Sequence, residues 1–387
     1  MFKKKNFFSN LSPNLKKTTQ SFQMLKKDIK NSEMPVLDSY NKNYQIDFSS
    51  SLVKKFSRYS NIVIIGMGGS VLGAQSIYLY LKKKIKKKLF FFDNLDENLY
   101  LNFLKIKKLK NSCFVVVSKS GNTIETIVNL DAILSKIKSK NKLVIITEIN
   151  DNNLFHLASK FNAEIIEHKN YIGGRYSVLS EAGMFPAKLM GLKTEKFRSL
   201  EKLISNKNFS SCLNKNVASI YSLFLKNINN SVILNYDPNS IGLCEWYKQV
   251  TSESLGKKGM GITPIISNCP KDHHSILQLY LDGPKNKFFT FFSSKSDNKK
   301  INSIVEAQCK AVKGIFKKKK IPYREFFFSK KNENELGTIF TFFVLETILL
   351  ARLMKVDPFN QPAVEEIKKE TKKILGQNLP KIILETP

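Results

Sequence analysis

The sequence has few cysteines and histidines, and neither residue type is arranged as a metal site would require. The five cysteines are an odd number, lie far apart and include no Cys-x-x-Cys pair: Cys113, Cys212, Cys244, Cys269 and Cys309. This pattern fits neither a disulfide framework nor a zinc site, and it favours a reducing compartment. The four histidines show no ligand spacing with carboxylates, so we expect no metal and no other cofactor.

The sequence also lacks a long uninterrupted apolar run. Its first ten residues, MFKKKNFFSN, carry charge without the apolar stretch of a signal peptide. The most apolar window, 337–354, is interrupted by Glu346 and Arg352, whereas a membrane-spanning helix needs about 20 mostly apolar residues. We therefore expect a buried helix in this window, and a soluble, cytoplasmic protein with no membrane partner.

Arginine and acidic residues are scarce relative to lysine, which gives the 387-residue chain a net charge of +31. Such a charge can indicate nucleic-acid binding. The excess, however, is almost entirely lysine spread along the whole chain, whereas arginine is the residue that reads base edges and forks onto phosphates. We interpret the charge as a compositional lysine bias. Nucleic acid is not an expected partner, and steeply salt-dependent DNA affinity would contradict this interpretation.

Short β-branched and aromatic runs alternate with longer helical patterns, which predicts parallel strands joined by helices. Most of these runs are apolar throughout, as expected for strands covered on both faces. Strands are predicted in the first half at 61–69, 88–94, 112–118, 142–148 and 163–169. A helical stretch at 180–227 follows, and then strands at 231–236, 260–266, 286–292 and 323–329. The part from 335 reads as helical, with a break at 357–359.

The predicted fold class is α/β, with two doubly wound parallel-sheet domains of three-layer α/β/α architecture and a C-terminal helical arm. The chain is long enough for two domains with a core each. We place an N-terminal domain with a helical extension at 1–195, a second α/β domain at 196–340, and the arm, which carries Lys368, at 341–387.

Two loops that follow predicted strands have the composition of an anion site. Gly66-Met67-Gly68-Gly69-Ser70 precedes a helical pattern, but Val71 breaks the G-x-G-x-x-G pattern of dinucleotide folds, and a simple tight turn is the alternative. Ser118-Lys119-Ser120-Gly121-Asn122-Thr123 is more informative. It places three hydroxyls and a glycine before a helix, which suits a phosphate group. Helix capping would explain only one of the three hydroxyls.

Four further segments carry candidate catalytic groups. In Gly173-Gly174-Arg175-Tyr176-Ser177, a fixed guanidinium suits a developing enediolate, although an exposed arginine after a turn is equally consistent. Glu253 lies near the C-terminal end of a helix that begins near residue 241. At that end the helix dipole disfavours negative charge, which suits a base, although a surface glutamate is commoner. The pair His273-His274 supplies imidazoles, the side-chain type that most often serves as acid or base, so either is a candidate for ring opening. Gln361 and Lys368 share a helix face, for which a solvated charged face is the alternative.

In this order, the segments resemble the glucose-6-phosphate isomerase family over roughly residues 62–375. The resemblance is carried by SKSGNT at 118–123, GGRYS at 173–177, ESLGK at 253–257 and Asn94-Leu95-Asp96. It implies two sugar isomerase-type domains and a metal-free aldose–ketose isomerase of glycolysis and gluconeogenesis. Such an enzyme interconverts glucose 6-phosphate and fructose 6-phosphate by ring opening and C1/C2 proton transfer through a cis-enediolate.

The resemblance also implies residue roles. Glu253 would be the base, Arg175 would stabilise the enediolate, and His274 would assist ring opening, with Lys368 near the ring oxygen. The remaining implied contacts to phosphate or sugar are those of Gly69, Ser70, Ser118, the Lys119 backbone, Ser120, Thr123, Gln249 and Gln361. In the family the site is shared between two subunits, which implies a homodimer in which the partner supplies the histidine.

Two departures leave alternatives open. Asn122 is unusual for the family, and the SGNT spelling resembles bifunctional phosphoglucose/phosphomannose isomerases; those relatives lack GGRYS, so the single-substrate interpretation stays ahead. His273 replaces the family's usual glutamine. A non-catalytic phosphosugar-binding module is a further alternative, but a sensor would need the phosphate loop without Glu253, Arg175, His274 and Lys368.

Overall fold

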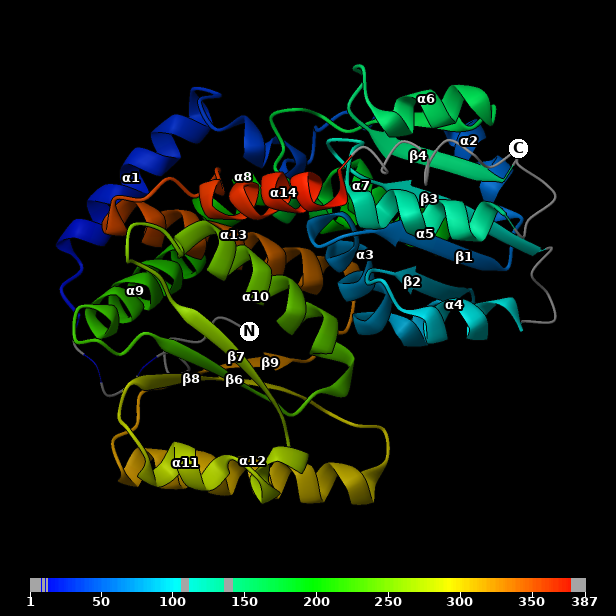
Figure 1. The fold of residues 1–387 in the computed structure, drawn as a ribbon. Helices are drawn as coiled ribbons and strands as arrows, with labels where there is room; N and C mark the ends of the chain where they lie inside the picture. Colours follow the sequence, from blue (N-terminus) through cyan, green and yellow to red (C-terminus); the bar gives the residue numbers. More distant parts are fainter. Residues whose placement is uncertain (1–7, 9–10, 12, 106–110, 136–141, 377–387) are drawn as a thin grey trace.

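The computed structural model describes residues 8, 11, 13–105, 111–135 and 142–376, which form two parallel β-sheets covered by helices (Figure 1). The first sheet has the order β2-β1-β3-β4-β5 and the second β7-β6-β8-β9. The strands are β1 Asn61–Gly66, β2 Lys88–Phe92, β3 Ser112–Val117, β4 Leu143–Thr147, β5 Glu164–Glu167, β6 Asn230–Asn235, β7 Thr263–Asn268, β8 Lys287–Ser294 and β9 Tyr323–Phe328.

Helices connect the strands and precede and follow the sheets. The α-helices are α1 Lys16–Lys30, α2 Ser50–Ser57, α3 Gly69–Tyr80, α4 Glu97–Leu104, α5 Ile124–Leu134, α6 Asn153–Lys160, α7 Glu181–Leu189, α8 Leu200–Ser205, α9 Lys207–Phe224, α10 Ile241–Leu255, α11 Leu277–Asp282, α12 Lys299–Lys318, α13 Glu333–Met354 and α14 Pro362–Leu375. Short 3₁₀ helices are η2 Pro35–Tyr40, η3 Lys82–Lys84, η5 Gly174–Leu179, η6 Thr194–Phe197, η7 Pro238–Ser240 and η8 Lys271–His274.

The predicted α/β class is confirmed, because every neighbouring pair of strands in both sheets is parallel. Each predicted strand run overlaps an observed strand. Strands β1, β3 and β4 are buried along their whole length, which explains why these runs do not alternate with polar residues. The largest shift is at β7, which begins three residues later than predicted because the preceding segment forms a turn closed by a bridge between Lys257 and Met260.

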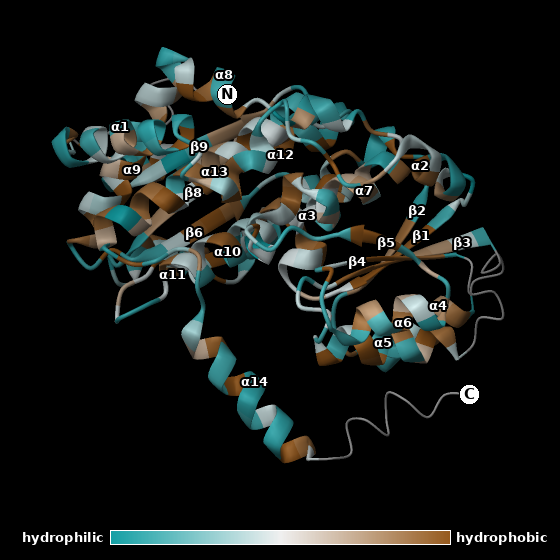
Figure 2. Cartoon of the chain, turned by 90° about the horizontal axis from the view of Figure 1, so that it is seen from above, coloured by the Kyte–Doolittle hydropathy of each residue, from teal (hydrophilic) through white to brown (hydrophobic). Residues whose placement is uncertain are grey.

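The two sheets share a middle layer of helices. Apolar residues of α4, α5 and α6 cover one face of the first sheet, and those of α11 and α12 cover one face of the second. The two inner faces pack into a single cluster with α3, α7, α10 and α13. In Figure 2 much of β1, β4 and β6 has the brown colour of hydrophobic residues. The molecule is therefore layered α/β/α/β/α, and the loops of both halves converge on the shared helices.

The expected arm does not begin at residue 341, because α13 runs unbroken across that position and is buried almost throughout. The free arm is α14, which has no buried residue and extends away from the body in Figure 2. By length and composition α13 could cross a membrane, but 83% of its most apolar window is buried inside the protein. As predicted, it is a buried helix, and its Glu346 forms an ion pair with Arg324 of β9.

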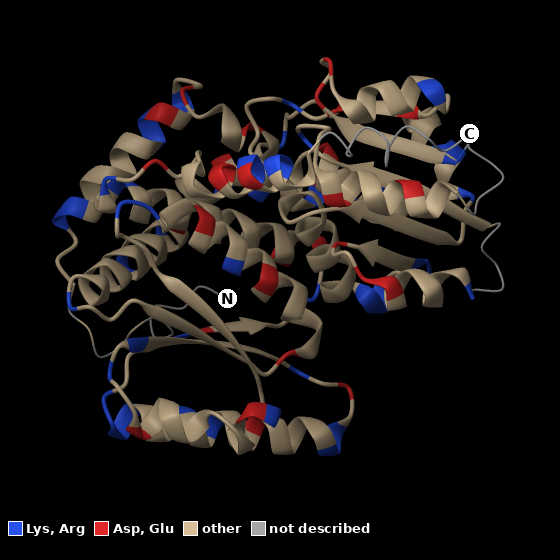
Figure 3. Cartoon of the chain, in the orientation of Figure 1, with Lys and Arg blue, Asp and Glu red and all other residues tan. Residues whose placement is uncertain are grey.

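Charged residues are spread over the described surface. Figure 3 shows Lys and Arg on helix ends and loops of both halves, interspersed with acidic residues. Many lysines form exposed pairs with carboxylates, such as Lys55 with Glu164 and Lys310 with Glu306. This distribution is what a compositional lysine bias predicts.

Candidate functional site

The two Gly- and Ser-containing loops meet at the carboxyl edge of the first sheet. Gly66 at the end of β1 pairs with Val117 at the end of β3, so Met67 and Ser118 begin neighbouring loops about 5 Å apart. Strand β2 lies on the other side of β1. The strands are therefore added in one direction from β1 to β2 and in the opposite direction from β3 to β5, and the switch lies between β1 and β3. Crevices at such switch points are where open α/β sheets bind ligands.

The segment Ser118–Thr123, here called the hydroxyl loop, presents its side chains at this crevice. The buried Ser118 Oγ lies 2.9 Å from Thr123 Oγ1, and Ser120 is exposed. Thr123 occupies the N-cap position of α5, yet its side chain makes no capping hydrogen bond. The capping alternative therefore does not account for these hydroxyls. The Lys119 side chain donates to the Asn170 carbonyl at 2.6 Å.

The GGRYS segment packs directly on the start of α3. A Cβ on Gly69 would lie 2.2 Å from the carbonyl carbon of Gly174, so only glycine fits at this crossing. The Ser177 hydroxyl donates to the Gly69 carbonyl at 3.4 Å and to the Gly174 carbonyl at 2.8 Å. The contact brings Arg175 beside Gly69 and Ser70 at the α3 N-terminus.

Arg175 is buried, with 3% of its surface exposed, which rules out the exposed-arginine interpretation. Its Nη1 lies 2.7 Å from Glu253 Oε1, in the geometry of an ion pair rather than of a linear hydrogen bond. Its Nη2 donates to the Asn360 carbonyl at 3.0 Å. Among the described residues, Nε makes no hydrogen bond. A buried donor left without a partner is costly, and an oxygen of a bound ligand would satisfy it.

Glu253 lies in the last turn of α10, as predicted, and its side chain is 25% exposed. One turn earlier, Gln249 donates from Nε2 to Glu253 Oε2 at 2.8 Å. The Gln249 side chain lies against Gly68, so it connects α10 to the loop after β1. The carboxylate is thus held by a guanidinium on one oxygen and by an amide on the other.

Two supporting residues of this site were not singled out from the sequence, although both belong to the quoted motifs. Lys257 donates from Nζ to the carbonyls of Glu253 and Ser254, and so satisfies the C-terminal end of α10; burial lowers the pKa of Lys257. The Tyr176 hydroxyl bonds Ser254 Oγ at 2.7 Å and the Pro358 carbonyl at 3.0 Å. GGRYS, ESLGK and the break before α14 therefore form one connected unit.

A pocket of 760 Å³ opens beside this unit, between the last turn of α10 and the segment 356–364. Glu253, Gln249 and Gln361 line it, together with Lys257. Gln361 occupies the position just before α14, so the helical arm begins at the rim of the pocket. The volume exceeds what a hexose phosphate occupies, and the pocket remains open next to Glu253.

The structure does not bring His274 or Lys368 to Glu253 within one chain. His274 is exposed in η8. Its neighbour His273 bonds the Tyr236 hydroxyl through Nε2 at 2.6 Å, and Tyr236 packs with α11 and α12, on the face of the second sheet opposite α10. Lys368 is exposed on α14 and pairs with Glu365 at 2.7 Å.

His168, at the end of β5, is a buried histidine that the sequence did not single out. Its Nδ1–H donates to the Lys169 carbonyl, 3.2 Å away, and burial lowers the pKa of His168 to about 4. The ring is therefore neutral at physiological pH, and it supports the segment between β5 and the GGRYS turn. Within the described ranges, no group of three or more His, Cys, Asp or Glu side chains is placed to hold a metal ion.

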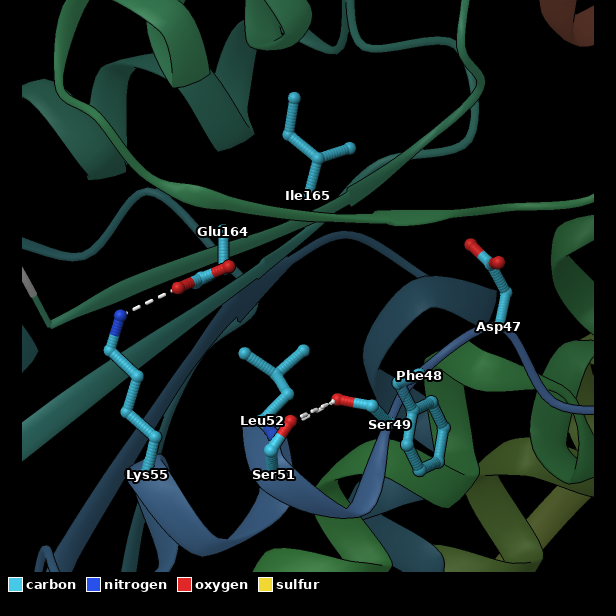
Figure 4. A pocket seen from close by; sticks show the side chains of 8 residues that line it. All are labelled: Asp47, Phe48, Ser49, Ser51, Leu52, Lys55, Glu164 and Ile165. Carbon is cyan, nitrogen blue, oxygen red and sulfur yellow. Dashed lines mark hydrogen bonds and ion pairs between the residues drawn. The ribbon is translucent and has the colours of Figure 1, made fainter.

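A second hollow, of 390 Å³, lies at the outer edge of β5 and holds none of the predicted site residues (Figure 4). Lys55 of α2 pairs with Glu164 across it at 2.5 Å, and Asp47 accepts the Glu167 N–H at 2.7 Å. These contacts cover a sheet edge that would otherwise offer free backbone groups to another chain.

Comparison with known proteins assigns the family. The family model for phosphoglucose isomerase matches residues 28–268. A glucose-6-phosphate isomerase of Methanocaldococcus jannaschii is 34% identical over 84% of this chain and 86% of its own. The crystal structure of a glucose-6-phosphate isomerase from Chlamydia trachomatis has the same fold, with a TM-score of 0.70 and 17% identity over 99% of this chain and 82% of its own. A Thermus thermophilus protein structure matches with a TM-score of 0.79 and 20% identity over 93% and 94%. The chain belongs to the phosphoglucose isomerase family.

Proposed function

We propose that this protein is a cytoplasmic enzyme that interconverts glucose 6-phosphate and fructose 6-phosphate by proton transfer between C1 and C2. The observation that carries the proposal is the Glu253–Arg175–Gln249 constellation, which lies beside the loop after β1. An aldose–ketose isomerase needs a positioned base, a cation for the enediolate oxygens and an anchor for the phosphate. In this proposal Glu253 is the base, Arg175 is the cation and the hydroxyl loop is the anchor.

In this proposal Glu253 removes the proton from one carbon and returns it to the next. Gln249 holds Oε2, so the carboxylate has little freedom to rotate away from the substrate. As the enediolate forms, Arg175 stays fixed by its hydrogen bond to the Asn360 carbonyl and supplies the positive charge that stabilises the developing negative charge. A donor that is already oriented and desolvated stabilises such a charge without reorganisation in the transition state.

The phosphate is bound in this proposal by the hydroxyl loop and the α3 N-terminus. Ser118, Ser120 and Thr123 provide hydroxyls, and Ser70 lies in the first turn of α3 next to Gly69. Helix N-termini and short hydroxyl donors favour a dianion at this position. Gln249 Oε1 has no donor among the described residues and is available to a sugar hydroxyl, as is Gln361 at the rim of the pocket.

Ring opening requires a group that a single chain does not place at the site. We therefore propose a homodimer in which His274 of one subunit enters the open pocket beside Glu253 of the other, with Lys368 near the ring oxygen. The exposure of His274 and of the whole of α14 supports this arrangement, because both are accessible to a second subunit. A site shared between identical subunits also requires twofold symmetry, which most homodimers have.

Mixing two inactive variants tests the shared site. We expect Glu253→Gln and His274→Ala to be inactive alone and to regain activity when they are unfolded and refolded together. Random heterodimers then contain one site with both wild-type groups, which restores roughly a quarter of the wild-type activity per protein. The matched control mixes Glu253→Gln with Arg175→Ala, which lie in the same site and cannot complement. No recovery in the first mixture, with dimers present, would contradict the shared site.

Substrate choice is tested by a coupled assay with glucose 6-phosphate and mannose 6-phosphate, which differ only in configuration at C2. We expect glucose 6-phosphate to be the better substrate by more than about tenfold in kcat/KM, a difference of about 1.4 kcal/mol. The SGNT spelling does not oppose this, because the hydroxyl loop binds the phosphate at C6, at the other end of the substrate. Equal rates with both aldoses would establish the bifunctional alternative.

A further inference from the structure

The hydroxyl loop is supported from behind by the segment 147–154 between β4 and α6. The Glu148 N–H donates to the Lys119 carbonyl and the Leu154 N–H to the Gly121 carbonyl, both at 3.1 Å. The Asn153 N–H donates to the Asn122 side-chain oxygen, also at 3.1 Å. The unusual Asn122 therefore has a role in holding the loop. The Lys119 and Gly121 carbonyls are thus turned towards the segment 147–154.

This support determines where the N–H groups of the loop point. In a trans peptide the carbonyl and the following N–H point in opposite directions. Because the Lys119 and Gly121 carbonyls face the segment 147–154, the N–H groups of Ser120 and Asn122 face away from it. The Asn122 N–H reaches the Ser120 hydroxyl at 3.3 Å, so this hydroxyl also lies on the far side. The segment thus orients the donors that a phosphate requires.

Asn152 of the segment 147–154 places its side chain against Gly121 of the hydroxyl loop. Its side chain is buried, with 4% exposed, and its Nδ2 donates to the Glu148 carbonyl at 2.9 Å and to Asn150 Oδ1 at 2.7 Å. Gly121 has a φ of +64°, and a Cβ added there would lie 1.7 Å from Asn152 Oδ1. The Asn152 amide therefore fills the space against the Gly121 backbone and prevents the turn from changing its conformation.

Capping of α6 explains only part of this geometry. A cap needs one acceptor, and Asn152 Oδ1 accepts the Phe155 N–H at 3.0 Å. The three bonds from Nδ2 run in the other direction, to the turn at 148–150, and they fix the amide plane against Gly121. A residue that only caps would not need them.

We infer that Asn152 is a positioning residue for the sugar-phosphate site, in that its side chain holds the Gly121 turn so that the donors of the hydroxyl loop face the phosphate. The inference rests on the proposed function, because it assigns the phosphate to this loop. Asn152 touches no substrate atom in this arrangement. Its effect is on phosphate affinity, while the proton transfer at Glu253 proceeds as before.

The decisive variant is Asn152→Ser, because serine caps a helix about as well as asparagine but cannot reach Gly121 and the 148–150 turn together. We expect the KM for glucose 6-phosphate and the inhibition constant of inorganic phosphate to rise in parallel by about tenfold, with kcat within about twofold, as for lost uniform binding. We expect the melting temperature to change little. Asn153→Ala is the matched control, because its side chain is exposed and its backbone bond to Asn122 is retained.

A double-mutant cycle provides a second measurement. Gly121→Ala alone should raise the same two constants by at least as much, because the new methyl group displaces Asn152. Asn152→Ala removes Oδ1 and Cγ, the two atoms nearest to a Cβ at position 121. In this background Gly121→Ala should therefore raise KM and the phosphate inhibition constant by less, so the effects of the two substitutions are not additive.

The inference is wrong if Asn152→Ser lowers the melting temperature and leaves both constants unchanged, because Asn152 would then act only as a cap. It is equally wrong if kcat falls while phosphate inhibition stays the same. Failure of the proposed function would look different: the wild-type protein itself would show neither turnover of glucose 6-phosphate nor inhibition by phosphate.

Discussion

Replacing Glu253 by glutamine is expected to abolish isomerisation while substrate binding persists. The amide keeps the size and hydrogen-bonding reach of the carboxylate but cannot accept the C1/C2 proton. Positioned acid–base groups contribute about 10²–10⁴-fold to rate, and here one group performs both transfers, so we expect kcat to fall by about a thousandfold or more. Because Arg175 and the hydroxyl loop are unchanged, the phosphate should still bind.

Two measurements check this prediction. A coupled assay gives kcat, and a thermal melt with and without substrate gives binding, since a ligand at about 100 times its Kd stabilises a protein by about 2.7 kcal/mol. Glu245→Gln is the matched control: it makes the same change on the same helix, at a residue that pairs with Lys248 on the surface. Loss of both turnover and substrate protection in Glu253→Gln would show that Glu253 is structural rather than catalytic.

Removing one partner of the buried Arg324–Glu346 pair is expected to destabilise the protein more than any surface change. Arg324 is 0% exposed and Glu346 1%. Arg324 also donates to Thr290 Oγ1 and Asn216 Oδ1, both at 2.9 Å, so the pair connects β8, β9, α9 and α13. Arg324→Met leaves a buried carboxylate without its cation, which costs about 3–5 kcal/mol of unfolding free energy.

Urea unfolding of three variants checks this prediction. The double variant Arg324→Met/Glu346→Leu should be more stable than Arg324→Met, because it removes the unpaired charge together with its partner. Lys310→Met, which breaks the exposed pair with Glu306, should change stability by less than about 0.5 kcal/mol. The prediction is wrong if Arg324→Met lowers the unfolding free energy no more than Lys310→Met does. It is also wrong if the double variant is the least stable of the three.

Much of the fold and part of the site followed from local sequence. The strand runs were recognisable because strands buried on both faces must be apolar along their length, and β1, β3 and β4 are. The hydroxyl loop and GGRYS were recognisable because phosphate and enediolate chemistry requires specific residue types at short spacing. Glu253 was found at the end of α10 for the same reason. The start of the arm was missed, because α13 has no Gly or Pro break at 340 and only packing shows where the core ends.

Residues that act through other residues were not recognisable in this way. Asn152 and His168 belong to no motif that separates them from other polar residues, and their contacts become visible only in the folded chain. The sequence also left open whether Arg175 is exposed. The structure buries it because the GGRYS turn is packed between α3 and α10, two helices from different halves of the chain.

The sequence by itself predicted the parallel strands and the anion-binding composition of the loop after β3, because each depends on residues within one short segment. The assignment of Glu253 as the base and Arg175 as the cation came from the family resemblance and stays a proposal. Only the tertiary structure decided that Glu253, Arg175 and Gln249 form one site, and that His274 and Lys368 do not reach it within the same chain. The physical reason is that two sheets packed on a shared helical layer bring the ends of α3 and α10 together, and no local pattern encodes that contact.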